Sequence, residues 1–211
     1  MMIKPILMNT EMVRAILDGR KTCTRRVIKP QWEECPACKY VHNEYIYDKM
    51  AENVYCARCG YPMEPERRSP YQPEDILYVR ETWHKYTKLV GKGEGCHPKE
   101  RYGYKASIAN AEDANEPWKP SIHMPKEAAR IWLKVTDVRV ERLQDITADG
   151  IRNEGLPSMA VHVGDMDVAL KEWETLWNST IKKSDIDRCG WDANPWIWVI
   201  EFERWEKPQE V

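Results

Sequence analysis

Apolar residues recur at helical spacing close to the start of the chain, at Met12, Val13, Ile16 and Leu17. Thr10 can cap the first turn of this helix, and Gly19 can supply the left-handed residue that ends it. The following residues, 22–28, are rich in β-branched and basic side chains and are predicted to be extended. A helix that stops at a glycine and continues as a basic strand is therefore expected within the first 28 residues.

Further strands are predicted where short apolar runs lie between turn signals, at residues 1–7, 76–79, 102–106 and 197–202. Residues 130–141 alternate between apolar and polar side chains, and the parity changes at Thr136 and Asp137. This change predicts a β-bulge in a strand with one buried face.

Two later helices are predicted. Residues 145–154 would be capped by Thr147 and ended by Gly155, and residues 167–178 carry an apolar stripe typical of core packing. Pro125 suits the start of a helical turn through Ala129. The glycine- and lysine-rich residues 86–96 are predicted to be a loop, residues 63–73 a linker and residues 110–117 an exposed turn region.

Length and charge limit the class of protein. A chain of 211 residues favours one domain with an appended module, and a formal charge of -2 argues against a generally basic nucleic-acid coat protein. Apolar runs stay below the roughly 18 residues of a membrane span, and the first ten residues lack a signal-peptide core. We expect a cytoplasmic protein without a membrane partner, and nothing in the sequence identifies a protein partner.

Four of the seven cysteines form two C-x2-C knuckles, Cys35 with Cys38 and Cys56 with Cys59, separated by 17 residues. Paired knuckles can deliver four thiolates to one tetrahedral ion, which predicts a single structural zinc. Four protein ligands leave no open position for a reacting water. Residues 31–70 contain almost no aliphatic core, so metal binding would have to supply the folding energy of this zinc-ribbon-like module. The alternative is that the thiols bind no metal and the segment is disordered.

The basic strand combines cations with hydroxyl groups. Arg20, Lys21, Arg25 and Arg26 surround Thr22 and Thr24. Three interpretations stay open: a solvated edge strand, an anion-binding strand, or a threonine nucleophile activated by a lysine.

Residues 16–26, I-L-D-G-R-K-T-C-T-R-R, are similar to the helix-turn-strand signature of ASCH-domain proteins in the PUA-like superfamily. The similarity continues at residues 75–81, 131–140, 145–155 and 196–202. The motifs at residues 118–125 and 191–196 resemble ASCH proteins encoded in phages and prophages. The resemblance implies an α+β fold, with a mixed PUA-like barrel and flanking helices formed by residues 1–30 and 71–206, interrupted by the module at 31–70.

ASCH members that hydrolyse the amide of N(4)-acetylcytidine use a lysine, a threonine and a glutamate. By motif position the resemblance assigns these catalytic roles to Lys21, Thr24 and Glu154. Thr24 would attack the carbonyl, Lys21 would accept the hydroxyl proton, and Glu154 would pass it to the leaving amine. Lys21 and Thr24 would lie on opposite faces of an uninterrupted strand, so Lys21 must still lie in the turn after Gly19.

The competing class is a PUA-like module that binds RNA or a modified nucleoside without breaking a bond, and a ribonuclease is a further alternative. Catalysis requires the three residues around one cavity, whereas binding predicts an open basic groove. Arg80 and Glu81 are alternatively a structural ion pair, and His123 a structural histidine. The candidate substrate-binding residues are Arg20, Arg25, Arg26, Arg80, Glu81 and His123.

Overall fold

The computed structural model describes residues 1–29, 31, 34–39, 45–48, 50–51, 53–62, 69–91, 96–108, 117–157 and 163–209. Its centre is a five-stranded sheet with the order β1-β5-β8-β9-β2. β1 and β5 run parallel, and the other neighbouring pairs run antiparallel. The strands are β1 (Ile3–Leu7), β5 (Ile76–Arg80), β8 (Trp132–Arg142), β9 (Trp196–Trp205) and β2 (Cys23–Val27). The α+β class is thereby confirmed.

The strand β9 is buried on both faces of the sheet. Its alternate residues Trp196, Trp198, Ile200 and Phe202 belong to the main core, which also contains residues of α1 (Thr10–Leu17). Ile197 and Val199 between them belong to a second core with α4 (Met166–Thr180). Such a continuous apolar run is typical of a strand covered on both sides.

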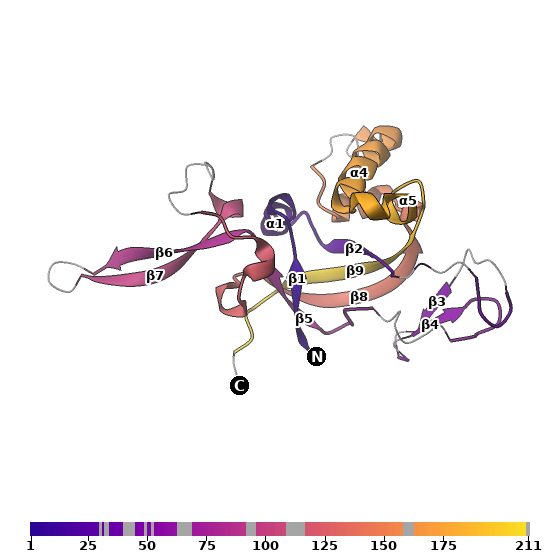
Figure 1. Ribbon diagram of the computed structural model, residues 1–211, viewed down its shortest axis with the longest axis horizontal. Helices are drawn as coiled ribbons and strands as arrows, with labels where there is room; N and C mark the ends of the chain where they lie inside the picture. The colour runs from indigo at the N-terminus through magenta and orange to yellow at the C-terminus, as the bar shows by residue number, and fades with distance from the viewer. Residues whose placement is uncertain are drawn as a thin grey trace.

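Helices gather at the β2 side of the sheet (Figure 1). The helix α2 (Ala148–Asn153) contacts α4, and α5 (Ile186–Cys189) follows α4. Trp173 and Trp177 of α4 are buried, which confirms the predicted apolar stripe. The short 3-10 helices are Lys105–Ser107, Ser121–His123, Lys126–Ala128, Leu143–Asp145 and Lys183–Asp185.

The predicted loop at residues 86–96 is wrong for the part that the structure describes. β6 (Trp83–Val90) and β7 (His97–Tyr104) form an antiparallel hairpin that projects from the body at the left of Figure 1. We call this hairpin the arm. Many of its side chains are exposed, so β6 and the first part of β7 lack the apolar alternation that would have predicted them. The predicted strand at residues 102–106 is confirmed for residues 102–104.

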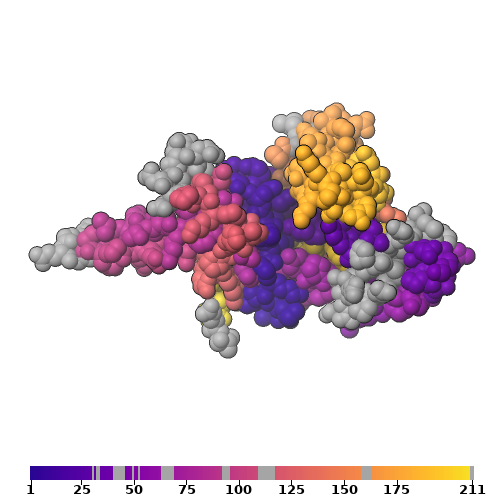
Figure 2. Space-filling view, in the orientation of Figure 1, coloured from indigo at the N-terminus to yellow at the C-terminus, as the bar shows by residue number. Residues whose placement is uncertain are grey.

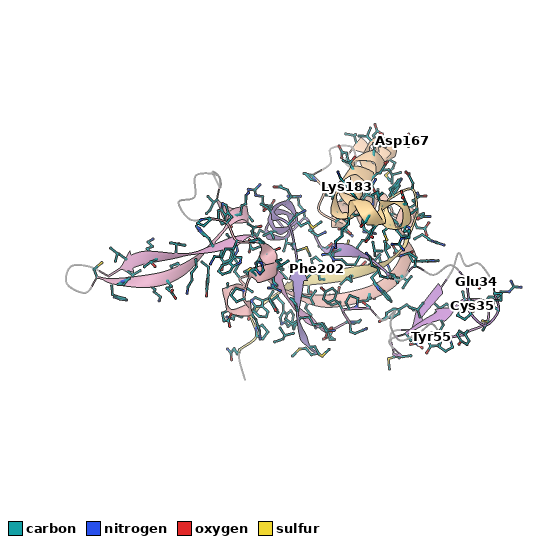
Figure 3. The ribbon with its side chains drawn as sticks, in the orientation of Figure 1. Glu34, Cys35, Tyr55, Asp167, Lys183 and Phe202 are labelled. Atoms are coloured by element: carbon teal, nitrogen blue, oxygen red, sulfur yellow. The ribbon has the colours of Figure 1, made fainter. Side chains whose placement is uncertain are left out.

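The cysteine module contains a second, smaller hairpin, β3 (Tyr45–Asp48) and β4 (Asn53–Cys56). The module packs on the sheet. The ring centroids of Tyr47 and Trp198 lie 5.3 Å apart, and the Tyr47 hydroxyl donates to Gln72 Oε1 at 2.6 Å. Figure 3 shows Cys35 and Tyr55 in this module, at the opposite end of the molecule from the arm.

The predicted barrel is not closed by the strands that the structure describes, because the edge strands β1 and β2 do not pair. A side chain joins these edges instead: Arg26 Nη2 on β2 donates to the carbonyl oxygen of Leu7 on β1 at 3.1 Å. The PUA-like assignment therefore stays a prediction.

Several local predictions are confirmed. Gly19 and Gly155 have φ angles of 74° and 85°, and Thr147 caps α2 by accepting from the amide of Gly150. The register of β8 against β9 shifts between Val135 and Asp137, as the predicted bulge requires. The α1 cap is Asn9 rather than Thr10, because the extended backbone of Asn9 lets its side chain accept from the Met12 amide at 2.8 Å. Residues 63–68 of the predicted linker and 110–116 of the predicted turn lie outside the described residues.

Candidate functional site

The turn after α1 places Lys21 outside β2. The amides of Arg20 and Lys21 both donate to the Ala15 carbonyl, at 2.9 and 3.0 Å. Lys21 then forms an isolated antiparallel bridge with Glu154, and β2 begins only at Cys23. The predicted position of Lys21, in the turn rather than in the strand, is confirmed.

Lys21 and Glu154 form a buried ion pair. Lys21 Nζ lies 2.5 Å from Glu154 Oε2 and also donates to the Glu154 carbonyl oxygen at 3.0 Å. The side chains are 0% and 2% exposed. Bulk water therefore screens the two charges very little, and their attraction is strong relative to a surface pair.

The glycine after Glu154 allows this close approach. Gly155 has a positive φ, and a Cβ there would lie 2.7 Å from Ala15 Cβ and 2.8 Å from Lys21 Cβ. Both the backbone conformation and the packing therefore favour glycine at the end of α2.

A second cation faces the same carboxylate. Arg25 Nη1 lies 3.2 Å from Glu154 Oε1, and Arg25 Nη2 lies 3.6 Å from Glu141 Oε2. Burial, followed by the negative charge of Glu154, raises the pKa of the neighbouring Cys23 thiol to about 12. The thiol is therefore neutral at ordinary pH and is not a nucleophile.

Thr24 is separated from this cluster by the strand itself. It pairs with Ile200, whose side chain belongs to the main core, whereas Arg25 pairs with Val199 on the second core. Thr24 is 1% exposed, and its hydroxyl has no hydrogen-bond partner among the described residues. The structure thus brings Lys21 and Glu154 together and leaves Thr24 without a hydrogen bond to either.

Two adjoining cavities form a groove beside this cluster. One has a volume of 240 Å³ and is lined in part by Arg20, Glu154 and Leu176, and the other has a volume of 620 Å³. They share Asn9 and Met12. Figure 2 shows a notch in the outline between the indigo surface of α1 and the orange and yellow surface of α4 and α5. Lys21 and Thr24 are not among the residues that line either cavity.

The larger cavity contains two of the predicted binding residues, Arg26 and Arg80. Arg26 donates to the carbonyl oxygens of Arg25 and Leu7, and Arg80 donates to those of Met124 and Ile122. Neither guanidinium forms an ion pair with a carboxylate of the described residues. Among the described residues, no carboxylate therefore compensates these two positive charges, which share one cavity.

Other lining residues of the larger cavity were not predicted. Tyr71 lies beside Arg26, and Ser179 and Thr180 end α4. Their positions depend on the packing of distant segments, so no local sequence signal identifies them.

Glu81 and His123 lie elsewhere. Glu81 is buried and forms a two-pronged ion pair with Arg130, at 2.8 and 2.9 Å, instead of facing Arg80. His123 is exposed at the end of a 3-10 helix and lines neither cavity. The alternative prediction for Glu81 was a structural ion pair with Arg80. Glu81 does form a structural ion pair, but with Arg130.

The four predicted cysteine ligands form one cluster. Their sulfur atoms all lie within 4.8 Å of one another, with 3.7 Å between Cys35 and Cys59 and 3.8 Å between Cys38 and Cys56. A tetrahedral ion with bonds of about 2.3 Å requires sulfur separations of about 3.8 Å. The donor set therefore fits a structural metal ion with four thiolate ligands.

The two knuckles have the same backbone geometry. The Lys39 amide donates to the Cys35 carbonyl and the Gly60 amide to the Cys56 carbonyl, both at 2.9 Å. Lys39 and Gly60, each four residues after the first cysteine of its knuckle, have φ angles of 55° and 69°. Gly60 suits the left-handed position in the second turn, and Lys39 takes the equivalent strained position in the first.

Within the part of the chain that the structure describes, no helix combines the length and the apolar character needed to span a membrane. Comparison of the chain with protein-family models, with curated proteins and with solved structures gives no match.

Proposed function

We propose that the groove between α1 and α4 binds the phosphate and base of an RNA nucleotide or a modified nucleotide. The observation that carries this proposal is the presence in one open cavity of 620 Å³ of two guanidinium groups, Arg26 and Arg80, that have no carboxylate partner among the described residues. A guanidinium offers several N–H donors in a fixed plane, which suits the oxygens of a phosphate. The proposal agrees with the function that the ASCH resemblance implies.

The other residues of the groove suit the rest of a nucleotide. The Tyr71 hydroxyl already donates to the Pro5 carbonyl at 3.0 Å, which holds its ring beside the cavity. Asn9 and Met12 continue the lining into the smaller cavity, where Glu154 and Arg20 lie. A phosphate at Arg26 and Arg80 would thus leave the base directed toward the Lys21–Glu154 pair.

Calorimetric titration with N(4)-acetylcytidine 5′-monophosphate tests this binding. Replacing both arginines, Arg26→Gln with Arg80→Gln, is expected to weaken binding at least about tenfold, because two charge-assisted hydrogen bonds are lost. N(4)-acetylcytidine without the phosphate should be affected much less. Arg188→Gln, an exposed arginine of α5, serves as the matched control. Equal affinity of the double variant and the wild type, or no binding by the wild type, would remove the proposal.

Hydrolysis of the N(4)-acetyl amide is a second candidate, favoured by the buried Lys21–Glu154 pair and by the unpartnered hydroxyl of Thr24. Lys21 would first pass a proton to Glu154, and the neutral amine would then accept the hydroxyl proton while Thr24 Oγ1 attacks the carbonyl carbon. Glu154 would protonate the departing exocyclic nitrogen, the C–N bond would break, and water would then release the acetyl group from Thr24 as acetate.

This reaction requires the acetyl group to reach the buried hydroxyl of Thr24. Thr24 lies on the opposite face of β2 from Arg25 and does not line the groove, so the acetyl group would have to displace the side chains that cover it. Conversion of N(4)-acetylcytidine to cytidine, followed by liquid chromatography, tests the reaction. Thr24→Ala should abolish it, whereas Thr22→Ala, at an exposed threonine two residues away, should retain it. If the wild type shows no turnover, hydrolysis is excluded and only the binding proposal is left.

We also propose zinc as the ion of the cysteine cluster. Four thiolates at tetrahedral spacing match the ligand set of structural zinc sites, in which no position is open for water. The ion would hold the two knuckles together and so support the module that packs on the sheet through Tyr47.

A further inference from the structure

We propose that one face of the arm binds single-stranded nucleic acid and holds one base in the pocket at the foot of the arm. This inference goes beyond the proposed function, because the arm is a separate surface from the groove. The register of β6 against β7 defines the face. We call it the basic face; its residues are His84, Tyr86, Lys88, Val90, His97, Lys99, Arg101 and Gly103.

The charges on the basic face have one sign. Lys88, Lys99 and Arg101 are exposed, and none of them forms an ion pair with another described residue. The carboxylate of the arm, Glu100, lies on the other face, where it pairs with Lys85 at 2.7 Å. Lys88 and Lys99 lie opposite each other on the two strands, and Arg101 lies one step of about 7 Å nearer the foot, so the cations form a short row of two steps along the arm. A phosphate backbone is the polyanion that such a row attracts.

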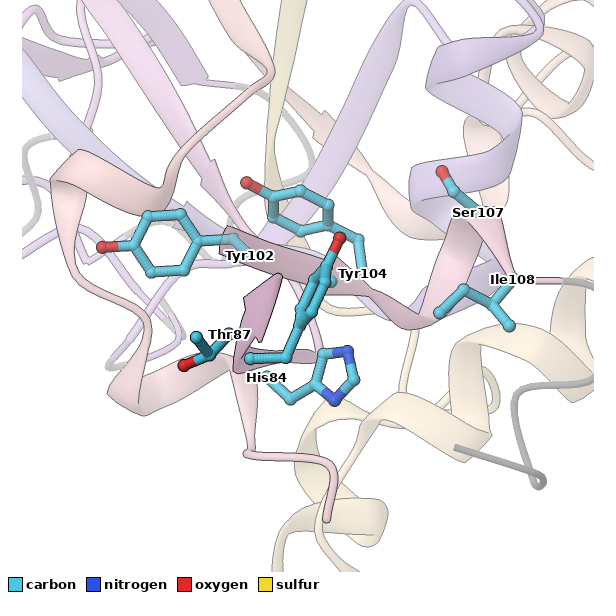
Figure 4. Close-up of a pocket in the computed structure, with 8 residues that line it drawn as sticks. His84, Thr87, Tyr102, Tyr104, Ser107 and Ile108 are labelled. Carbon is cyan, nitrogen blue, oxygen red and sulfur yellow. The ribbon is translucent and has the colours of Figure 1, made fainter. Parts of the chain in front are cut away.

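The row leads to an aromatic pocket of 610 Å³ at the foot of the arm. His84 and Tyr86 of the basic face line it. Tyr102 and Tyr104 also line it, but their register places them on the other face of the arm (Figure 4). The ring of Trp118 stacks behind His84, with 4.5 Å between the centroids at an angle of 32°. The ring of Tyr86 therefore supplies the surface of the basic face on which a base can stack.

His84 provides a polar contact in this pocket. Its side chain is only 8% exposed, and Nδ1 has no hydrogen-bond partner among the described residues. A buried polar atom without a partner is costly, and a base can supply the missing donor or acceptor. Gly103 makes room for the ring, since a Cβ there would lie 1.9 Å from His84 Nε2.

Tyr86 joins the two parts of this surface. It lies between His84 and Lys88 on the basic face and also lines the pocket. A strand whose phosphates follow Lys88, Lys99 and Arg101 would therefore reach the pocket at Tyr86. The spacing of cations and aromatic rings fits a flexible single strand, because paired bases have no free face to stack.

Fluorescence anisotropy of labelled oligouridine and oligodeoxyuridine tests the proposal. Lys88→Glu is expected to weaken binding several-fold, whereas Lys85→Glu, the same charge change on the opposite face of β6, should have less than a twofold effect. Tyr86→Ala should weaken binding on the order of tenfold through lost stacking. The combined change of Lys88, Lys99 and Arg101 to glutamine should lower the slope of log affinity against log salt by about 2, since each neutralised phosphate contributes about 0.7.

The two oligonucleotides distinguish RNA from DNA as the source of the strand. Circular dichroism of each variant verifies that the sheet is intact. Affinities of Lys88→Glu and Tyr86→Ala within twofold of the wild type, or equal losses in Lys85→Glu, would overturn the proposal. The groove variant with Arg26→Gln and Arg80→Gln is tested with the mononucleotide, so failure of the groove proposal and failure of the arm proposal give different results.

Discussion

Lys21 Nζ and Glu154 Oε2 lie 2.5 Å apart, although 133 residues separate them in the chain, and neither side chain is more than 2% exposed. The pair connects the turn after α1 to the end of α2. Arg25 contacts the other oxygen of the same carboxylate at 3.2 Å. One carboxylate therefore compensates two buried cations.

This arrangement predicts that replacing Glu154 lowers the free energy of unfolding more than replacing Lys21 does. Glu154→Gln leaves Lys21 and Arg25 without their shared carboxylate, and is expected to lower the free energy of unfolding by about 3 to 5 kcal/mol. Lys21→Met should lower the free energy of unfolding by less, because Arg25 still pairs with Glu154 in that variant. Chemical denaturation of both variants measures the difference. A larger cost for Lys21→Met would contradict the shared role of the carboxylate.

The unpartnered hydroxyl of Thr24 predicts that Thr24→Val stabilises the fold. Valine has nearly the same shape and removes a buried polar atom whose desolvation costs about 1 to 3 kcal/mol. The free energy of unfolding should therefore rise by up to that amount, while turnover of N(4)-acetylcytidine, if Thr24 is the nucleophile, is lost. Thr24→Ser, which keeps the hydroxyl, is the control. A destabilised Thr24→Val would mean that the hydroxyl is hydrogen-bonded in solution.

The cysteine cluster predicts one bound zinc per chain. Native mass spectrometry should show the mass of one zinc ion, and a chelator should remove it and unfold the module. Cys56→Ser should lose the ion, because one of the four thiolate ligands is replaced. Cys96→Ser, at an exposed cysteine outside the cluster, should retain it. A metal-free wild type with an intact module would contradict the site.

The raised pKa of Cys23 predicts slow alkylation. Burial and the charge of Glu154 raise this pKa from 9.0 to about 12, so the neutral thiol persists in the folded chain well above neutral pH. Iodoacetamide at about pH 8 should modify exposed Cys96 and leave Cys23 unmodified, as peptide mass mapping would show. Between pH 9.0 and about 12 the unfolded chain loses the Cys23 proton first, so this group lowers stability as pH rises. Rapid modification of Cys23 in the native chain would contradict its burial.

The close packing around Gly155 predicts a local effect on the ion pair. Gly155→Ala forces an unfavourable positive φ and brings a Cβ to 2.8 Å from Lys21 Cβ. The substitution should lower the free energy of unfolding by more than the roughly 1 kcal/mol of the backbone alone. Gly164→Ala, at a positive φ with no atom within 4 Å of the added Cβ, isolates that backbone cost. Equal losses in the two variants would show that Lys21 is not displaced.

The sequence by itself determined features that depend on a few neighbouring residues. The stop at Gly19, the cap at Thr147, the bulge at Thr136 and Asp137, and the two cysteine knuckles all follow from local conformational preference or fixed ligand spacing. The motif resemblance selected Lys21 and Glu154 together with Thr24, and it assigned the roles that stay proposals.

Only the tertiary structure decided how these groups meet. The pairing of β2 with β9 turned Thr24 toward the main core and Arg25 toward Glu154, because neighbouring residues of a strand face opposite sides. It also decided that Glu81 pairs with Arg130 and that Arg26 and Arg80 share a cavity. The prediction found only the end of β7, at residues 102–104, and missed the rest of the arm because both of its faces carry polar residues. Tyr86 and Thr87 were the available signal for β6. Contacts between distant segments carry no local pattern, so packing alone determines them.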